Sequence, residues 1–287
     1  MTYTSTDATR HPLFISLIRI AFFLSISLSF AAAFAASKVH KSMLDASNLK
    51  KSGQYTFSRC KSIQGKPFNQ QSNKKKVLII GDSMACDFIN MVHENGFLQN
   101  YQIRLRFIPY RCQTVIGKQS SRYIAAKDRP YCANPARADT LERSKSQMHE
   151  ADVVIFVSRW KIKIARHLPW VIKQMRKGNR NKVVVIGSKF FGKIDIRRYF
   201  RTPEKELHKI QNKVGTEASD INAILAKGLG RDIMFVDPHR IICGNKETCP
   251  VFTSDLQLIS YDGRHLTKAG AKYSGRLLFQ KSGLGKL

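Results

Sequence analysis

Short apolar runs alternate with amphipathic stretches along most of the chain. Five runs rich in β-forming residues occupy residues 77–80, 103–108, 153–157, 183–186 and 233–236. Apart from the start of 103–108, these runs are continuous rather than alternating. Continuous apolar runs are typical of strands that are buried on both faces of a sheet.

Helical patterns lie between these runs. The apolar residues Met84, Phe88 and Met91 share one helix face, and Asn95-Gly96 marks the end of that helix. Further helices are expected at residues 138–149, 163–176, 204–227 and 268–281, and residues 109–137 read as an irregular insertion. Strands that alternate with helices predict an α/β fold with a mostly parallel sheet.

The amino-terminal segment bears on the compartment. An uncharged apolar stretch runs from Ile20 to Ala36 and ends near Ala33-Phe34-Ala35, an A-x-A pattern. Its length favours a cleaved signal peptide, with an uncleaved anchor as the alternative. A buried core helix is disfavoured because the stretch is not amphipathic. Both leading interpretations place the chain beyond residue 37 in the periplasm or outside the cell, either secreted or held by a single anchor.

The charge of the chain is strongly positive. Lys and Arg total 49 against 20 Asp and Glu, a formal net charge of +29. Nucleic acid is the default partner of such a chain, but an extracytoplasmic location and the scarcity of aromatic residues among the basic clusters disfavour it. Single clusters, such as Lys189 with Lys193, are expected on solvated faces. Together they favour anionic substrates or an anionic membrane or envelope surface as partners.

Six cysteines in an oxidising compartment predict disulfides. Short separation along the chain favours the pairs Cys243–Cys249 and Cys112–Cys132, and the pair Cys60–Cys86 follows only by elimination. A zinc site is disfavoured, because the chain has no C-x-x-C pair and its histidines are scattered. We expect no metal and no cofactor.

Ser83 directly follows the first predicted strand, in Ile80-Gly81-Asp82-Ser83, and a helix starts at once. Ligands of open parallel sheets bind at the carboxyl ends of the strands. The hydroxyl of Ser83 can therefore face a crevice, where backbone N–H groups of the helix start can stabilise an oxyanion. A helix-capping serine without chemistry explains the position equally well.

A second candidate element lies near the carboxyl end, in the loop before the last predicted helix, which Thr267 is expected to cap. There the D-x-x-H spacing lets the carboxylate of Asp262 reach a ring N–H of His265. The other ring nitrogen is then free to accept a proton from a serine hydroxyl. Taken alone, this pattern is more often a solvated surface loop.

Together, Gly81-Asp82-Ser83 and Asp262-x-x-His265 resemble the GDSL-type, or SGNH, hydrolase superfamily over residues 74–283. The resemblance implies a three-layer α/β/α sandwich around a mostly parallel five-stranded sheet, which is flavodoxin-like. It also implies that Ser83 is the nucleophile, His265 the general base and Asp262 the residue that orients the base. The chain is most similar to SGNH domains fused to membrane acyltransferases that O-acetylate bacterial surface polysaccharides.

The chain departs from the superfamily at the oxyanion donors, which come from a Gly after the second strand and an Asn after the third. Here the nearest glycine is Gly117, and Ser158-Arg159-Trp160 follows the third strand. The candidates for oxyanion or substrate contacts are therefore the Ser83 backbone, Gly117, Arg159 and Trp160. The side chain of Arg159 suits an acidic glycan, although a surface arginine is an equally good interpretation.

These observations predict three parts: a signal peptide or anchor at 1–36, a polar linker at 37–73, and an SGNH-type catalytic domain at 74–287. The predicted function is transfer or removal of O-acyl groups, chiefly acetyl, on a cell-envelope polysaccharide, with transfer favoured. Because the membrane acyltransferase part is missing, transfer calls for a separate membrane protein that delivers the acyl group. The alternatives are a carbohydrate esterase or deacetylase with the same triad, and a non-catalytic basic scaffold that binds anionic polymer.

Overall fold

A computed structural model describes residues 38–178, 181–244 and 247–287. The predicted signal peptide or anchor at 1–36 lies outside these residues. Within them, no helix combines the length and the apolar character that crossing a membrane requires.

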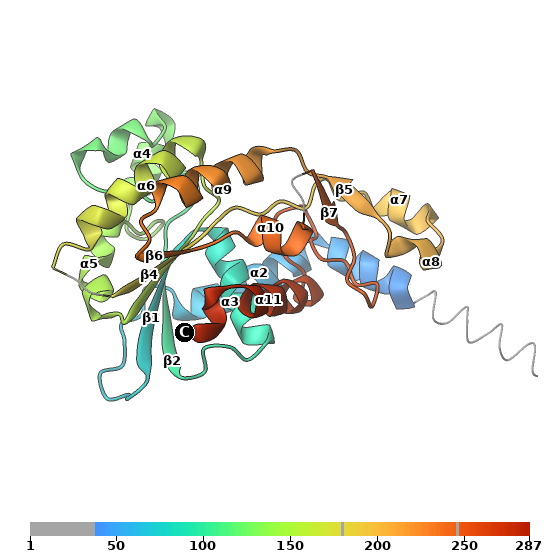
Figure 1. The fold of residues 1–287 in the computed structure, drawn as a ribbon, viewed down its shortest axis with the longest axis horizontal. Helices are drawn as coiled ribbons and strands as arrows, with labels where there is room; N and C mark the ends of the chain where they lie inside the picture. The colour runs from blue at the N-terminus through green and yellow to red at the C-terminus, as the bar shows by residue number, and fades with distance from the viewer. Residues whose placement is uncertain (1–37, 179–180, 245–246) are drawn as a thin grey trace, which may run out of the picture.

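A five-stranded parallel sheet forms the centre of the fold (Figure 1). Its strands are β1 (Lys75–Gly81), β2 (Tyr101–Phe107), β3 (Val153–Val157), β4 (Lys182–Ile186) and β6 (Ile233–Val236), in the order β2-β1-β3-β4-β6. All five predicted strands are confirmed. Side chains of β1 and β3 are buried along most of their length on both faces, which explains their continuous apolar runs.

Helices cover both faces of the sheet and complete the predicted three layers (Figure 1). One layer contains α2 (Leu49–Ile63), α3 (Ser83–Glu94) and α11 (Lys268–Lys281); the other contains α5 (Leu141–Glu150), α6 (Ile162–Met175) and α9 (Glu217–Gly228). Alternate residues of the strands pack against the two helical layers. Ile79 and Ile155 pack in the first core, whereas Ile80 and Phe156 pack in the second.

The single helix predicted at 204–227 is wrong. The segment forms α8 (Glu204–Leu207), β5 (Gln211–Lys213) and α9 instead. Gly215, with a φ of 65°, takes the backbone out of the helical region, and β5 pairs in antiparallel fashion with β7 (Thr248–Pro250). The insertion at 109–137 is mostly irregular, with short helical pieces η1 (Lys118–Arg122), η2 (Ala126–Asp128) and α4 (Arg129–Ala133).

A small lobe extends from one end of the sandwich (Figure 1). It comprises β5, β7, α7 (Ile196–Arg201), α8 and the helical residues 38–47, and it has a core of its own around the fully buried Met43 and Tyr199. Near it, α10 (Pro238–Cys243) follows β6 and packs on β7. At the carboxyl end of the chain, η3 (Gly283–Lys286) follows α11, away from this lobe (Figure 1).

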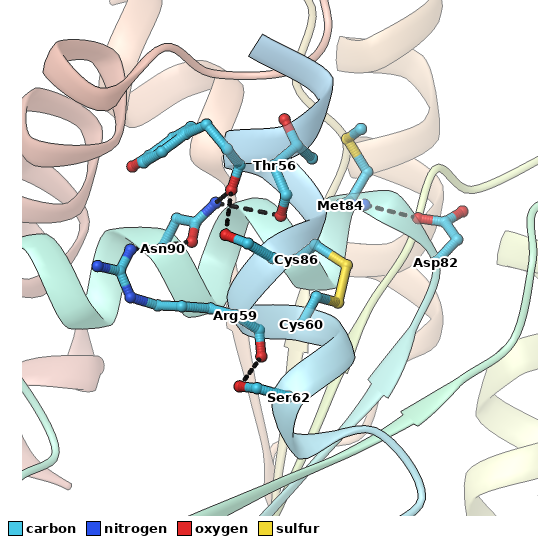
Figure 2. Close-up of a disulfide and its surroundings, with 10 residues drawn as sticks. Thr56, Arg59, Cys60, Ser62, Asp82, Met84, Cys86 and Asn90 are labelled. Atoms are coloured by element: carbon cyan, nitrogen blue, oxygen red, sulfur yellow. Dashed lines mark hydrogen bonds between the residues drawn. A yellow bond between two sulfur atoms is a disulfide. The ribbon is translucent and has the colours of Figure 1, made fainter. Parts of the chain in front are cut away.

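The predicted polar linker at 37–73 is wrong over its helical part. Residues 38–47 pack in the small lobe, and α2 packs on α3. The face of α2 that is buried is small and largely polar, with Ser52, Thr56 and Cys60, so the segment lacks the apolar stripe that marks a core helix. Hydrogen bonds compensate, since the amide of Asn90 on α3 donates to the backbone carbonyl of Thr56 (Figure 2).

Three disulfides join the cysteines in the predicted pairs, Cys60–Cys86, Cys112–Cys132 and Cys243–Cys249. The first bond ties α2 to the first turn of α3 (Figure 2). Such bonds are typical of proteins in oxidising compartments and stabilise the fold largely by restricting the unfolded chain.

Candidate active site

The turn after β1 places Ser83 at the topological switch point of the sheet. The loops after β1 and β3 leave toward opposite helical layers there, and ligands of such sheets bind in the crevice between them. A Cβ atom on Gly81 would lie 1.7 Å from the carbonyl oxygen of Val157, so only glycine lets the two strand ends approach this closely.

Asp82 caps helix α3 and joins the two loops. Its carboxylate accepts the backbone N–H of Met84 at 2.9 Å and that of Arg159, after β3, at 3.0 Å. Asp82 is almost completely buried, and burial raises the pKa of its carboxyl group to about 6, although both backbone donors and the nearby His265 oppose the rise.

Ser83 is the first residue of α3, and the capping role belongs to Asp82. The interpretation of Ser83 as a helix cap is therefore wrong. Within the described part of the chain, the Ser83 hydroxyl forms no hydrogen bond. Its side chain lines an open pocket with Phe57 and Tyr110, at the amino terminus of α3, where backbone N–H groups favour negative charge.

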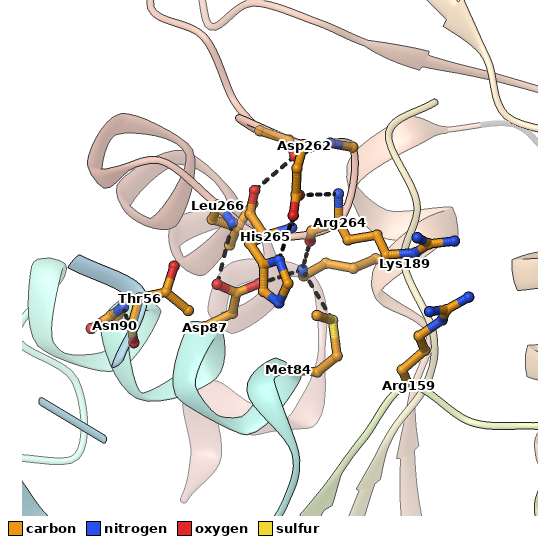
Figure 3. Close-up of polar contacts among 12 residues, drawn as sticks. Thr56, Met84, Asp87, Asn90, Arg159, Lys189, Asp262, Arg264, His265 and Leu266 are labelled. Atoms are coloured by element: carbon orange, nitrogen blue, oxygen red, sulfur yellow. Dashed lines mark hydrogen bonds and ion pairs between the residues drawn. The ribbon is translucent and has the colours of Figure 1, made fainter. Parts of the chain in front are cut away.

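His265 is held by Asp262 on the loop before α11 (Figure 3). The Nδ1 atom of His265 lies 2.6 Å from Oδ2 of Asp262, and Oδ1 accepts the backbone N–H groups of Arg264 and His265. Burial raises the pKa of Asp262, but the hydrogen bond and charge of His265 and the backbone donors outweigh it and lower the pKa to about 2. Nε2 of His265 is buried without a hydrogen-bond partner in the described residues.

A buried ion pair fixes this loop against α3. Asp87 lies one helical turn after Ser83, on the same face of α3. One oxygen of its fully buried carboxylate accepts the backbone N–H of Leu266 at 3.2 Å, and the other lies 2.6 Å from Nζ of Lys189. Nζ of Lys189 also donates to the carbonyl of Arg264 (Figure 3). The loop of His265 is thus docked on the helix that Ser83 begins.

This pair was not predicted from the sequence. Lys189 was expected on a solvated face, and no role was expected for Asp87. The only local signal is a carboxylate between Met84 and Phe88 on an otherwise apolar helix face, a position where a charged residue needs a buried partner.

Aromatic rings from two elements contact His265. The ring of Tyr261 stacks on the imidazole with centroids 5.7 Å apart, and the ring of Phe57 on α2 lies at 6.4 Å. The Tyr261 hydroxyl lies 3.1 Å from Oγ1 of Thr56, and burial raises the pKa of Tyr261 to about 12. Helix α2, which was predicted to be linker, therefore contributes directly to the site.

The structure corrects most of the predicted oxyanion donors. The backbone N–H of Gly117 donates to Glu142 at 2.6 Å, and the indole N–H of Trp160 donates to the carbonyl of Ile186 at 2.8 Å. The backbone N–H of Arg159 is bound to Asp82. These three N–H groups are occupied, so the backbone of Ser83 at the start of α3 is the retained backbone candidate. The guanidinium of Arg159, predicted as a charged donor or glycan contact, is not engaged by Asp82 and stays a prediction.

No three His, Cys, Asp or Glu side chains gather into a possible metal site in the part of the chain that the structure describes.

One family model covers most of the described chain. A model of the family described as "SGNH domain (fused to AT3 domains)" matches residues 50–280. No curated protein matches the chain.

Solved structures are similar to the chain at low identity and low TM-score. The catalytic domain of peptidoglycan O-acetyltransferase A from Streptococcus pneumoniae has 12% identity and a TM-score of 0.39, covering 72% of this chain and 94% of that one. A GDSL-like lipase from Bacteroides thetaiotaomicron has 14% identity and a TM-score of 0.36, covering 84% and 98%. An acetyl-xylooligosaccharide esterase from Geobacillus stearothermophilus has 9% identity and a TM-score of 0.38, covering 72% and 93%.

Proposed function

The chain belongs to the SGNH domain family, and on that premise we propose that it is an extracytoplasmic serine enzyme acting on O-acetyl groups of a cell-envelope polysaccharide. In this proposal Ser83 is the nucleophile, His265 the general base and Asp262 the residue that orients His265. Transfer to a sugar hydroxyl is the favoured reaction, because the matching family model describes domains fused to AT3 partners. The three disulfides support a location outside the cytoplasm.

One observation carries the proposal. The Nδ1 side of His265 is engaged by Asp262, whereas Nε2 is buried and has no partner in the described residues. An imidazole in this state is ready to accept a proton. The neighbouring residue Leu266 is docked on Asp87, one helical turn after Ser83, which supports the pairing of His265 with Ser83 in this proposal.

The reaction then follows from the roles of these groups. The oxygen of Ser83 attacks the acetyl carbonyl while Nε2 of His265 takes the hydroxyl proton. The backbone N–H of Ser83 and the amino terminus of α3 stabilise the oxyanion. His265 returns the proton to the departing alcohol, which leaves an acetyl ester on Ser83. A sugar hydroxyl or water then attacks this ester, with its proton passing to His265 and finally to the Ser83 oxygen.

Substitution of Ser83 tests the enzyme class. The Ser83→Ala variant is expected to lose turnover of p-nitrophenyl acetate while its circular dichroism spectrum stays unchanged. The matched control is Ser62→Ala, at an exposed serine on α2. Mass spectrometry of the wild-type protein should find the acetyl group on the Ser83 peptide. Full activity in Ser83→Ala would refute the triad, and absence of turnover in the wild-type protein would favour a non-catalytic scaffold.

Product analysis separates transfer from hydrolysis. The wild-type protein is incubated with an acetyl donor and a de-O-acetylated polysaccharide. New O-acetyl esters on the polysaccharide support transfer, whereas release of acetate alone supports an esterase with the same triad. In a cell, the proposed source of the acetyl group is a membrane protein.

A further inference from the structure

A second crevice adjoins the pocket that Ser83 lines. Met84, the residue after Ser83, and Arg159 are part of its wall. The guanidinium of Arg159 lies 4.6 Å from the ring of Tyr110, which lines the Ser83 pocket. Arg159 therefore lies between the two, in the wall of the crevice and beside the pocket that Ser83 lines.

Two arginines from separate loops face the crevice, and neither has a carboxylate partner in the described residues. The guanidinium of Arg159 is stacked on Tyr110, and that of Arg264 lies 5.3 Å from the ring centre of Phe190. Figure 3 shows both side chains extending in the same direction, away from His265. Stacking on a ring orders a guanidinium while its N–H groups remain available.

A buried hydroxyl in the same wall also lacks a partner. Ser188 is 7% exposed, and its Oγ forms no hydrogen bond within the described part of the chain. Its backbone is fixed, because Oδ1 of Asn222 accepts its N–H at 2.7 Å and Nδ2 donates to its carbonyl at 2.9 Å. Buried hydroxyls are normally hydrogen bonded, so an oxygen of a bound molecule would complete this one.

The other charges of the crevice leave it positive. The ammonium of Lys189 is neutralised by Asp87 behind the wall. Glu217 also lines the crevice, but it is exposed and forms no ion pair with either arginine in the described residues. Two guanidinium groups thus face one solvated carboxylate.

We propose that Arg159, Arg264 and the hydroxyl of Ser188 bind an anionic group, a carboxylate or a phosphate, on the glycan whose O-acetyl ester lies at Ser83. The planar guanidinium matches both groups in a two-pronged geometry. The substrate class is then an acidic polysaccharide rather than a neutral one. This inference rests on the proposed function, which supplies the ester at Ser83.

Kinetic discrimination tests the proposal. Initial rates are measured with O-acetylated oligosaccharides of glucuronic acid, with a phosphate-bearing oligosaccharide and with a neutral O-acetylated xylooligosaccharide. In Arg159→Gln and Arg264→Gln, the ratio of kcat/KM for the anionic over the neutral substrate should fall about tenfold, mainly through KM. Glu217→Gln should raise this ratio. The ratio is compared for the glucuronic acid substrate and for the phosphate-bearing one. The substrate whose ratio falls more in the arginine variants identifies carboxylate or phosphate as the natural group.

A charge-matched control separates the crevice from the general positive field. Arg197→Gln changes an exposed arginine of α7 in the small lobe and removes the same charge. It should leave the ratio unchanged. Equal losses in Arg197→Gln and Arg159→Gln, or an unchanged ratio in both crevice variants, would overturn the proposal.

Binding without turnover distinguishes this inference from the proposed function. Calorimetry on Ser83→Ala should show tighter binding of oligoglucuronate than of xylooligosaccharide, and adding Arg159→Gln and Arg264→Gln should abolish the difference. If the wild-type protein hydrolyses esters but this preference is absent, the anion site is refuted and the proposed function stands. If the preference is present but Ser83-dependent turnover is absent, the anion site stands and the proposed function is refuted.

Discussion

Two carboxylates belong to the candidate site, and their pKa values are shifted in opposite directions. Asp82 and Asp262 each accept two backbone N–H groups. Burial dominates at Asp82 and raises its pKa to about 6. At Asp262 the contact with His265 outweighs burial, and the pKa falls to about 2. The same residue type therefore serves one side of the site as a helix cap and the other as a partner for a base.

Substitution of each carboxylate should have very different effects on activity. Asp262→Asn is expected to lower kcat for p-nitrophenyl acetate about ten-thousand-fold, because an amide favours the wrong imidazole tautomer and cannot stabilise its charged form. Asp82→Asn should lose no more than about tenfold, since asparagine caps helices as well as aspartate does.

Steady-state kinetics of the two purified variants give the comparison directly. Circular dichroism is the control for folding. Equal losses in both variants would contradict the assignment of distinct roles to the two carboxylates.

The second prediction concerns the ion pair that fixes the Asp262 side of the site. Lys189→Met leaves the fully buried carboxylate of Asp87 without its cation and should lower the free energy of unfolding by about 3–5 kcal/mol in urea titrations. The double variant Asp87→Leu with Lys189→Met should regain much of this loss.

The exposed neighbour Lys193 supplies the control. Lys193→Met should change stability by less than about 0.5 kcal/mol. A loss of that small size in Lys189→Met would show that the pair does not hold the loop.

The third prediction uses the opposite pKa shifts. Because the folded-state pKa of Asp82 lies above its ordinary value of 3.8, its contribution destabilises the fold as pH rises from about 4 to about 6, by roughly 1–3 kcal/mol. The lowered pKa of Asp262 acts in the other direction. Its stabilisation is complete above about pH 4 and is lost as pH falls toward about 2.

Unfolding titrations across these two pH windows test both signs. Asp82→Asn should remove only the loss of stability between about pH 4 and 6. Asp262→Asn should remove only the loss of stability below about pH 4. If the two variants lost the same dependence, the contrast between the carboxylates would be wrong.

The smallest expected effect concerns the contact between α2 and the His265 loop. Tyr261→Phe removes the hydroxyl that lies 3.1 Å from Thr56 and should cost about 1 kcal/mol of unfolding free energy. Tyr131→Phe is the control, because the Tyr131 hydroxyl has only a long, exposed contact of 3.5 Å. Equal and negligible changes would show that this contact does not stabilise the loop.

Local pattern was enough to predict the strands and the two site motifs. Strands buried on both faces require continuous apolar residues, and β3 has the predicted bounds. The edge strand β6 also has the predicted bounds, although only Val236 in it is buried. Thr267 caps α11 as expected, because its hydroxyl accepts the N–H of Gly270. The broken helix at 204–227 was missed because its middle pairs with β7, a segment distant in the chain.

The family resemblance suggested which positions supply the oxyanion donors, but in this chain the N–H groups at those positions form other hydrogen bonds. Gly117 and Trp160 were candidates by their place in the sequence, yet their N–H groups serve Glu142 and Ile186. Donor availability depends on every neighbour of an N–H group, so it could not be predicted from the position of a residue after a strand.

The sequence alone determined the α/β architecture, the placement of Ser83 after the first strand and the D-x-x-H pattern, because strand burial and turn chemistry are encoded in neighbouring residues. Only the tertiary structure decided how the site is held together. Asp87 and Lys189 meet across 102 positions of the chain, and α2 meets Tyr261 across a still longer separation. A buried charge reveals its partner only when the chain is folded, since the cost of burial selects a partner by distance in space rather than along the sequence.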